Sequence, residues 1–310
     1  MNRVAPSVCK MVVVDAQILR GTPVALLELL PLRGLRLHVS MIAFEEFWAQ
    51  AAKERDGSLF IKRITRLAPL VDSKEPVKTT GGDLVRRIGG MTRGALSSTA
   101  PSAKAGLLQM WERIVSGRVP PEVIVESGSK VEAGAATRDA EFLATLERSR
   151  NLPSRTLLDD LPEAERTRLL SHTFSELLKP LISIQGGIQE RFHAYFRYVG
   201  LLAARTAPGV PLKPKAENDA EDMQLLMHLG EGAFLATEDR DLIFKVDSSD
   251  TFQAPWVRTV AELASIELPV GIPWGKSARR AAERHVVRTR SQLKELDVEV
   301  RAQVDARASH

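Results

Sequence analysis

Only one cysteine, Cys9, occurs among the 310 residues of the chain. A single thiol excludes an internal disulfide and any zinc site built from several cysteines. No run of apolar residues approaches the ~20 that a membrane-spanning helix needs. The first ten residues are too few and too polar for a signal peptide. These absences predict a cytoplasmic protein that has no membrane partner.

Two common functional patterns are also missing. The six histidines show no metal-ligand spacing. His228 lies in an apolar helical pattern, so we expect it to be a core residue. The glycine pairs at residues 81–82 and 89–90 lack the lysine and the hydroxyl residue of a phosphate-binding loop. The chain therefore shows no sign of a P-loop nucleotide site.

The composition is that of a soluble globular protein, with 44% hydrophobic and 26% charged residues. The length allows one large domain or two of ordinary size. The net charge of +4 permits a nucleic-acid partner without establishing one. Basic residues gather after residue 60, either as a solvated surface or as phosphate contacts. The candidate substrate contacts among them are Lys62, Arg63, Arg86 and Arg87.

The stretch from 217 to 242 carries the densest pattern of chemistry. Asp219 and Asp222 open a helical pattern and, three residues apart, share one face of it. A short apolar run at 233–236 follows, as in a strand buried on both faces. Residues 237–241 (Thr-Glu-Asp-Arg-Asp) then fall at the carboxyl end of that strand, the edge of a parallel sheet where ligands bind. Taken alone, the stretch also fits an ordinary capped helix, turn and strand.

Further acids arrive at the same kind of position from the N-terminal part of the chain. A β-branched strand at 11–14 ends in Asp15, and a second strand is expected at 35–39. Ser40 then precedes an apolar helix that contains Glu45 and Glu46. Burying an unpaired carboxylate there is costly, so we expect one of the two glutamates to face solvent and the other to face a site.

The rest of the chain breaks this α/β rhythm. Residues 51–215 are expected to form a mainly helical insertion, with helices at 106–115, 138–149, 159–182 and 187–207. Beyond the central stretch, residues 242–246 predict a strand and residues 257–266 a helix. Residues 269–310 predict a basic, helical C-terminal extension. The α/β domain is therefore expected to be discontinuous, made of residues 1–50 and 216–268.

Asp15, Glu46, Asp222 and Asp239 are thus expected to meet at one sheet edge, with Asp219 and Asp241 beside them. Carboxylates gathered at one point repel one another, and a hard divalent cation is their natural partner. Magnesium held there could activate a water for displacement at a phosphodiester.

Four segments carry a family resemblance: 12–15 (Val-Val-Val-Asp), 40–47 (Ser-Met-Ile-Ala-Phe-Glu-Glu-Phe), 218–226 (Asn-Asp-Ala-Glu-Asp-Met-Gln-Leu-Leu) and 234–242 (Phe-Leu-Ala-Thr-Glu-Asp-Arg-Asp-Leu). In this order they resemble a PIN-domain nuclease, a family that includes the toxin ribonucleases of bacterial toxin–antitoxin pairs. The resemblance implies a three-layer α/β/α fold with a parallel sheet and RNA cleavage dependent on magnesium or manganese. It leaves open a protein partner such as an antitoxin, and a homo-oligomeric state.

The resemblance also implies roles by position. Asp15, Glu46, Asp222 and Asp239 match the four acids in order, and Thr237 matches the hydroxyl residue before the last one. The rivals are Glu45 for the second acid and Asp219 for the third. The family usually has a hydroxyl residue and an asparagine after the first aspartate, where this chain has Ala16 and Gln17.

Two other functions compete with the nuclease. The substitution by Ala16 and Gln17 would suit a non-catalytic module on the same fold that binds nucleic acid or assists assembly. A haloacid-type phosphatase also places aspartates at strand ends. That chemistry needs a second aspartate two positions after Asp15, and Gln17 stands there instead.

Overall fold

The computed structural model describes residues 11–79, 100–150, 158, 160–178, 188–205 and 216–264. The predicted substrate contacts Arg86 and Arg87 lie outside these residues, as does the predicted C-terminal extension at 269–310. No helix in the described ranges combines the length and the apolar character that crossing a membrane would take.

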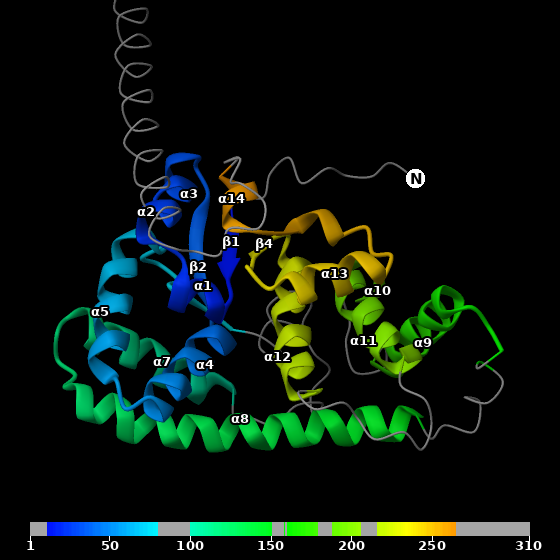
Figure 1. The fold of residues 1–310 in the computed structure, drawn as a ribbon, viewed down its shortest axis with the longest axis horizontal. Coiled ribbons are helices and arrows are strands. Elements are labelled where there is room, and N and C mark those ends of the chain that lie inside the picture. The colour runs from blue at the N-terminus through cyan, green and yellow to red at the C-terminus, as the bar shows by residue number, and fades with distance from the viewer. Residues whose placement is uncertain are drawn as a thin grey trace, which may run out of the picture.

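Five parallel strands form one sheet, which confirms the α/β class (Figure 1). The strands are β1 (Met11–Val14), β2 (Arg36–Ser40), β3 (Val77–Lys78), β4 (Phe234–Ala236) and β5 (Val257–Arg258), in the spatial order β3-β2-β1-β4-β5. The chain builds outward to β3 on one side of β1 and to β5 on the other. The order therefore reverses between β1 and β4, and ligands of open parallel sheets bind at such a switch point.

The apolar strand residues divide between two cores. Val12 and Val14 pack with Leu37 and Val39 in the larger core, while Leu235 of β4 belongs to the second. Neighbouring residues of a strand point to opposite faces, so both faces of the sheet are covered. This double burial explains why β1 is an uninterrupted β-branched run.

Helices from the first quarter of the chain cover the larger core. They are α1 (Ala16–Gly21), α2 (Val24–Leu27), α3 (Leu29–Leu32), α4 (Met41–Lys53) and α5 (Gly57–Leu67). Phe44 of α4 anchors this core, with its ring centroid 5.6 Å from that of Phe60 and 5.8 Å from that of Trp111. Residues from α5 to β3 therefore belong to the α/β unit, although they fall within the insertion predicted from residue 51.

The second core packs helices from the later part of the chain against β4 and β5. These are α11 (His193–Arg205), α12 (Ala216–Leu226), η3 (Met227–Glu231) and α13 (Arg240–Ser248). The other helices within the described ranges are η1 (Ala68–Leu70), α7 (Ala100–Val115), α8 (Pro121–Arg150), α9 (Glu163–Leu178), α10 (Ile188–Arg191), η4 (Ala254–Trp256) and α14 (Val260–Leu263).

Two sequence expectations are wrong at the C-terminal side of the sheet. Residues 242–246 lie in helix α13 instead of a strand, because Asp239 caps the helix and the buried Leu242 and Val246 are one helical turn apart. The expected helix at 257–266 begins instead as strand β5, and Val260–Leu263 form a helix within its described part, which ends at residue 264.

The insertion contributes one long helix that reaches both halves of the structure. Helix α8 has 30 residues and contacts both α4 and one end of α12 (Figure 1). The indole N–H of Trp48 donates to the carbonyl of Ile124 at 2.9 Å. A Cβ on Gly128 would lie 2.8 Å from the Trp48 carbonyl oxygen, so the two helices approach closely at this glycine.

Arg63 fastens α5 to the end of α1. Its guanidinium donates to the backbone carbonyls of Leu19 at 2.6 Å, of Ile18 at 3.1 Å and of Thr22. These carbonyls lie at the C-terminus of a helix, where backbone acceptors lack partners within the helix and a cation is favoured. Arg63 therefore stabilises the contact between α5 and α1, whereas the sequence predicted that it contacts substrate.

We expect Arg63→Ala to lower the free energy of unfolding by about 1–3 kcal/mol, because it leaves partly buried carbonyls without a charged donor. The neighbouring Lys62 is exposed, so Lys62→Ala is the matched control and should change stability little. Urea unfolding of the two variants measures both effects. Equal midpoints would contradict the structural assignment of Arg63.

Candidate functional site

Asp15 and Thr237 face each other where β1 and β4 end. The register pairs Val14 with Ala236, so the next residue of each strand lies at the same edge. The Asp15 N–H donates to the Ala236 carbonyl at 3.2 Å, and the Thr237 hydroxyl donates to the Asp15 carboxylate. The first acid and the hydroxyl residue of the sequence pattern are therefore in direct contact at the switch point.

Asp15 is buried and caps α1. Its Oδ1 accepts a hydrogen bond from the Ile18 N–H at 2.8 Å. Burial raises the pKa of Asp15 to about 7, against the lowering effect of the bonds from Thr237 and Ile18. The negative charges of Glu46 and Asp239 raise this pKa further. Asp15 therefore interacts electrostatically with both Glu46 and Asp239.

Asp239 is the N-cap of α13 and joins that helix to the sheet edge. Its Oδ1 accepts from the backbone N–H groups of Asp241 at 2.8 Å and Leu242 at 3.1 Å. Its Oδ2 accepts from the Gln17 side chain at 3.0 Å, and its own N–H donates to the Thr237 hydroxyl at 3.0 Å. Gln17 therefore takes part in the site, although it departs from the family pattern.

Glu46 reaches the same neighbourhood from α4, where it pairs with Arg20 at 3.3 Å. Burial raises the pKa of Glu46, Arg20 lowers it, and the charge of Asp239 raises it again. The charge of Asp239 therefore acts on Glu46 as it does on Asp15. Glu221, on α12, hydrogen-bonds to Glu46. The sequence interpretation missed it, although it stands between Asp219 and Asp222.

Asp219 and Asp222 of α12 share a tyrosine. The Tyr198 hydroxyl is 3.0 Å from Asp219 Oδ1 and 3.1 Å from Asp222 Oδ2, so its one proton can serve only one carboxylate at a time. Burial raises the pKa of Asp222 to about 7, and the charges of Asp239 and Asp219 contribute to the rise. Burial and the two aspartates also raise the pKa of Tyr198.

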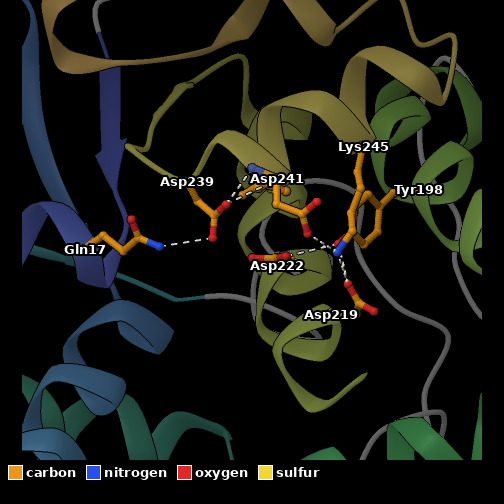
Figure 2. A network of polar contacts seen from close by, with 8 residues as sticks. Gln17, Tyr198, Asp219, Asp222, Asp239, Asp241 and Lys245 are labelled. Carbon is orange, nitrogen blue, oxygen red and sulfur yellow. Dashed lines mark hydrogen bonds and ion pairs between the residues drawn. The ribbon is translucent and has the colours of Figure 1, made fainter. Parts of the chain in front are cut away.

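Lys245 of α13 completes the network. Its ammonium lies 2.7 Å from Asp219 Oδ1 and 2.8 Å from Asp241 Oδ2. Figure 2 shows the side chains from Gln17 through Asp239 and Asp222 to Tyr198 lying across the front of α12 and α13. The sequence analysis did not connect Tyr198 or Lys245 with the acids, because neither forms part of an acid pattern.

The chemistry of this set suits a hard divalent cation. Asp15, Glu46 and Asp222 each have a raised pKa to which the charge of Asp239 contributes, so a cation among them would relieve a shared repulsion. As the side chains stand, no three acids, histidines or cysteines in the described part of the chain are arranged to hold one ion. Glu46 instead forms an ion pair with Arg20, and Asp222 accepts a hydrogen bond from the Tyr198 hydroxyl.

Two other sequence expectations concern Lys62 and His228. Lys62 is exposed on α5, as a phosphate contact would have to be. His228 is fully buried, with Nε2 3.2 Å from the Ser40 hydroxyl, which agrees with a core residue. Ser40 precedes α4 as expected, although its side chain makes no capping bond to that helix.

The pKa of Asp15 predicts how stability changes with pH when divalent ions are removed. Between about pH 4 and pH 7 the folded protein binds more protons than the unfolded chain, because this acid titrates near 7 instead of near 3.8. The free energy of unfolding should therefore fall with rising pH across this window, by as much as about 4 kcal/mol from Asp15.

Asp15→Asn should remove that part of the pH dependence, since asparagine also caps helices well. Chemical unfolding in a chelator, at several pH values between 4 and 8, measures it. Asp247→Asn, at an exposed position of α13, is the control and should keep the wild-type profile. Parallel profiles for wild type and Asp15→Asn would show that the buried carboxyl does not titrate in this range.

Comparison with known proteins adds no assignment to this geometry. No protein-family model matches the chain. No curated protein and no solved structure matches it either. A functional interpretation therefore depends on the residues at the switch point and on the resemblance of the four sequence segments.

Proposed function

We propose that the protein is a metal-dependent nuclease that hydrolyses phosphodiester bonds, with RNA as its substrate class. One observation carries the proposal: the charge of Asp239 contributes to the raised pKa of Asp15, Glu46 and Asp222, which come from three other elements. These groups gather beside the switch point of the sheet, where such folds bind ligands. Clustered acids with raised pKa values are typical of functional sites.

The metal would be magnesium or manganese, held by the carboxylates of Asp15, Glu46, Asp222 and Asp239. It would supply a bound water of lowered pKa and offset the negative charge of the scissile phosphate. Asp219 and Asp241 stand farther out, at Lys245.

The chain's own residues fix the orientation of this set. The Thr237 hydroxyl donates a hydrogen bond to one carboxylate oxygen of Asp15, and the Ile18 N–H donates to the other. The N-terminus of α13 holds Asp239 through Oδ1, and Gln17 holds it through Oδ2. Such partners typically matter 10- to 100-fold for metal affinity or activity. The reactive edge is therefore positioned before any substrate arrives.

The biological role proposed by the resemblance is that of a toxin ribonuclease, which would have an antitoxin as its protein partner. A processing or defence ribonuclease would use the same acids. A small reading frame next to the gene would favour the toxin role, and copurification of its product with this chain would establish the pair.

Asp239→Asn should lower the cleavage rate at least about a hundredfold. The substitution removes a carboxylate that would hold the metal and whose charge acts on Asp15, Glu46 and Asp222. Asparagine is as good an N-cap as aspartate, so α13 should remain folded. The measurement is cleavage of labelled single- and double-stranded RNA and DNA with manganese and with a chelator. Asp247→Asn is the control, since Asp247 is exposed on the same helix.

Full activity of a purified, folded Asp239→Asn protein would contradict this mechanism. DNA cleavage without RNA cleavage would keep the metal site and change the substrate class. Because Asp15→Asn leaves a cap and a hydroxyl contact in place, it should behave like Asp239→Asn in the same assay.

A non-catalytic nucleic-acid-binding module is the second candidate. The contact of Gln17 with Asp239 favours it, because this amide occupies a carboxylate oxygen that a metal would otherwise use. A module of this kind would bind RNA equally well in chelator and would cleave nothing with manganese. Binding and cleavage measured on one RNA with both additions separate the two functions.

A further inference from the structure

Arg20 brings a positive charge to the acids from helix α1. It lies in the last turn of that helix, and its Nη2 pairs with Glu46 Oε1 at 3.3 Å. Gln17, three residues earlier on the same exposed face of α1, bonds to Asp239 at 3.0 Å (Figure 2). This one face of α1 therefore contacts two of the four acids that were predicted from the sequence.

The guanidinium of Arg20 has donors to spare. Arginine carries five N–H donors, and in the part of the chain that the structure describes Glu46 is its one partner. The Arg20 side chain is 36% exposed, so solvent reaches part of it. An ion pair this exposed contributes little to stability. The pair with Glu46 therefore leaves Arg20 available to a ligand.

Two other cations on neighbouring helices are more fully engaged than Arg20. The ammonium of Lys245 is shared by two aspartates, at 2.7 Å and 2.8 Å. The guanidinium of Arg63 donates to three backbone carbonyls. Arg20 differs from both because it lies beside the acids and still has open donors. It was not among the substrate contacts predicted from the sequence.

The charge of these acids makes a cation necessary for any phosphate that approaches them. Glu46 and Asp239 both raise the pKa of Asp15, so the local field is negative. That field repels the phosphates of a nucleic acid. A guanidinium has the opposite sign, and its planar fork matches two oxygens of a phosphate. Arg20 therefore has the charge and the shape that a phosphate needs at this edge.

We propose that Arg20 binds a phosphate of the RNA strand beside the candidate centre, while its pair with Glu46 holds the guanidinium in place. This inference rests on the proposed function and names a substrate contact for it. The contact needs no metal ion, because the donors belong to the chain itself.

The test measures binding of a labelled single-stranded RNA to the full chain in a chelator, at several salt concentrations. Arg20→Gln should weaken binding and reduce the slope of log K against log salt concentration by about 0.7, the share of one phosphate contact. Arg20→Lys keeps the charge but loses the fork, so it should bind more weakly with the slope of wild type.

Arg36→Gln is the matched control. Arg36 forms an ion pair with Asp72 at 3.7 Å, and it pairs in register with Met11, at the opposite end of the strands from Asp15. Its loss removes the same charge and should leave the slope unchanged. Urea unfolding verifies that all variants are folded. Equal slopes in wild type and Arg20→Gln would overturn the inference, as would an equal reduction in Arg36→Gln.

Cleavage with manganese gives a second readout and separates this inference from the proposed function. A phosphate contact made equally in the ground and transition states should raise the KM of Arg20→Gln more than it lowers kcat. Cleavage with an unchanged KM leaves the nuclease standing and removes the contact. RNA binding that depends on Arg20, without any cleavage, supports the contact and removes the nuclease. Neither binding nor cleavage of RNA by wild type overturns both.

Discussion

The hydroxyl of Thr237 is the contact on which the site depends. It donates to the Asp15 carboxylate and accepts from the Asp239 N–H, so one oxygen links the ends of two strands to the start of α13. The two residues of the Asp15–Thr237 bond are 222 positions apart. Parallel pairing of β1 with β4 is what brings them together. A hydroxyl suits this place because it can donate to one group and accept from another.

The carboxylates around this hydroxyl are held at a cost in stability. Desolvation is the largest cause of the raised pKa of Asp15, Glu46 and Asp222, and their charges add to it. Arg20 and Lys245 offset only part of this repulsion in the described structure. A chain selected for stability alone would have apolar residues at such positions. Acids kept at such positions with raised pKa values are typical of a functional site.

The local sequence pattern was sufficient to locate the strand ends that carry Asp15 and Thr237. It was insufficient to predict the helix and the side chains that surround them. The valines of β1 and the run at 233–236 identified Asp15 and Thr237, because a buried strand must end at a sheet edge. Residues 242–246 were mistaken for a strand, since their apolar content outweighed the helical spacing of Leu242 and Val246. The contacts of Tyr198 and Lys245 with the acids were not predicted, because they are set by the packing of α11 and α13 on α12, which no local pattern encodes.

The insertion also contributes to the site through α8. This helix packs against α4, which carries Glu46, and against α12, which carries Asp222 (Figure 1). The close approach at Gly128 and the bond from Trp48 to Ile124 fix its position on α4. Since α4 and α12 pack in different cores, α8 is one helix that contacts both of the elements carrying Glu46 and Asp222. The insertion therefore supports the two helices that bring these acids to the candidate site.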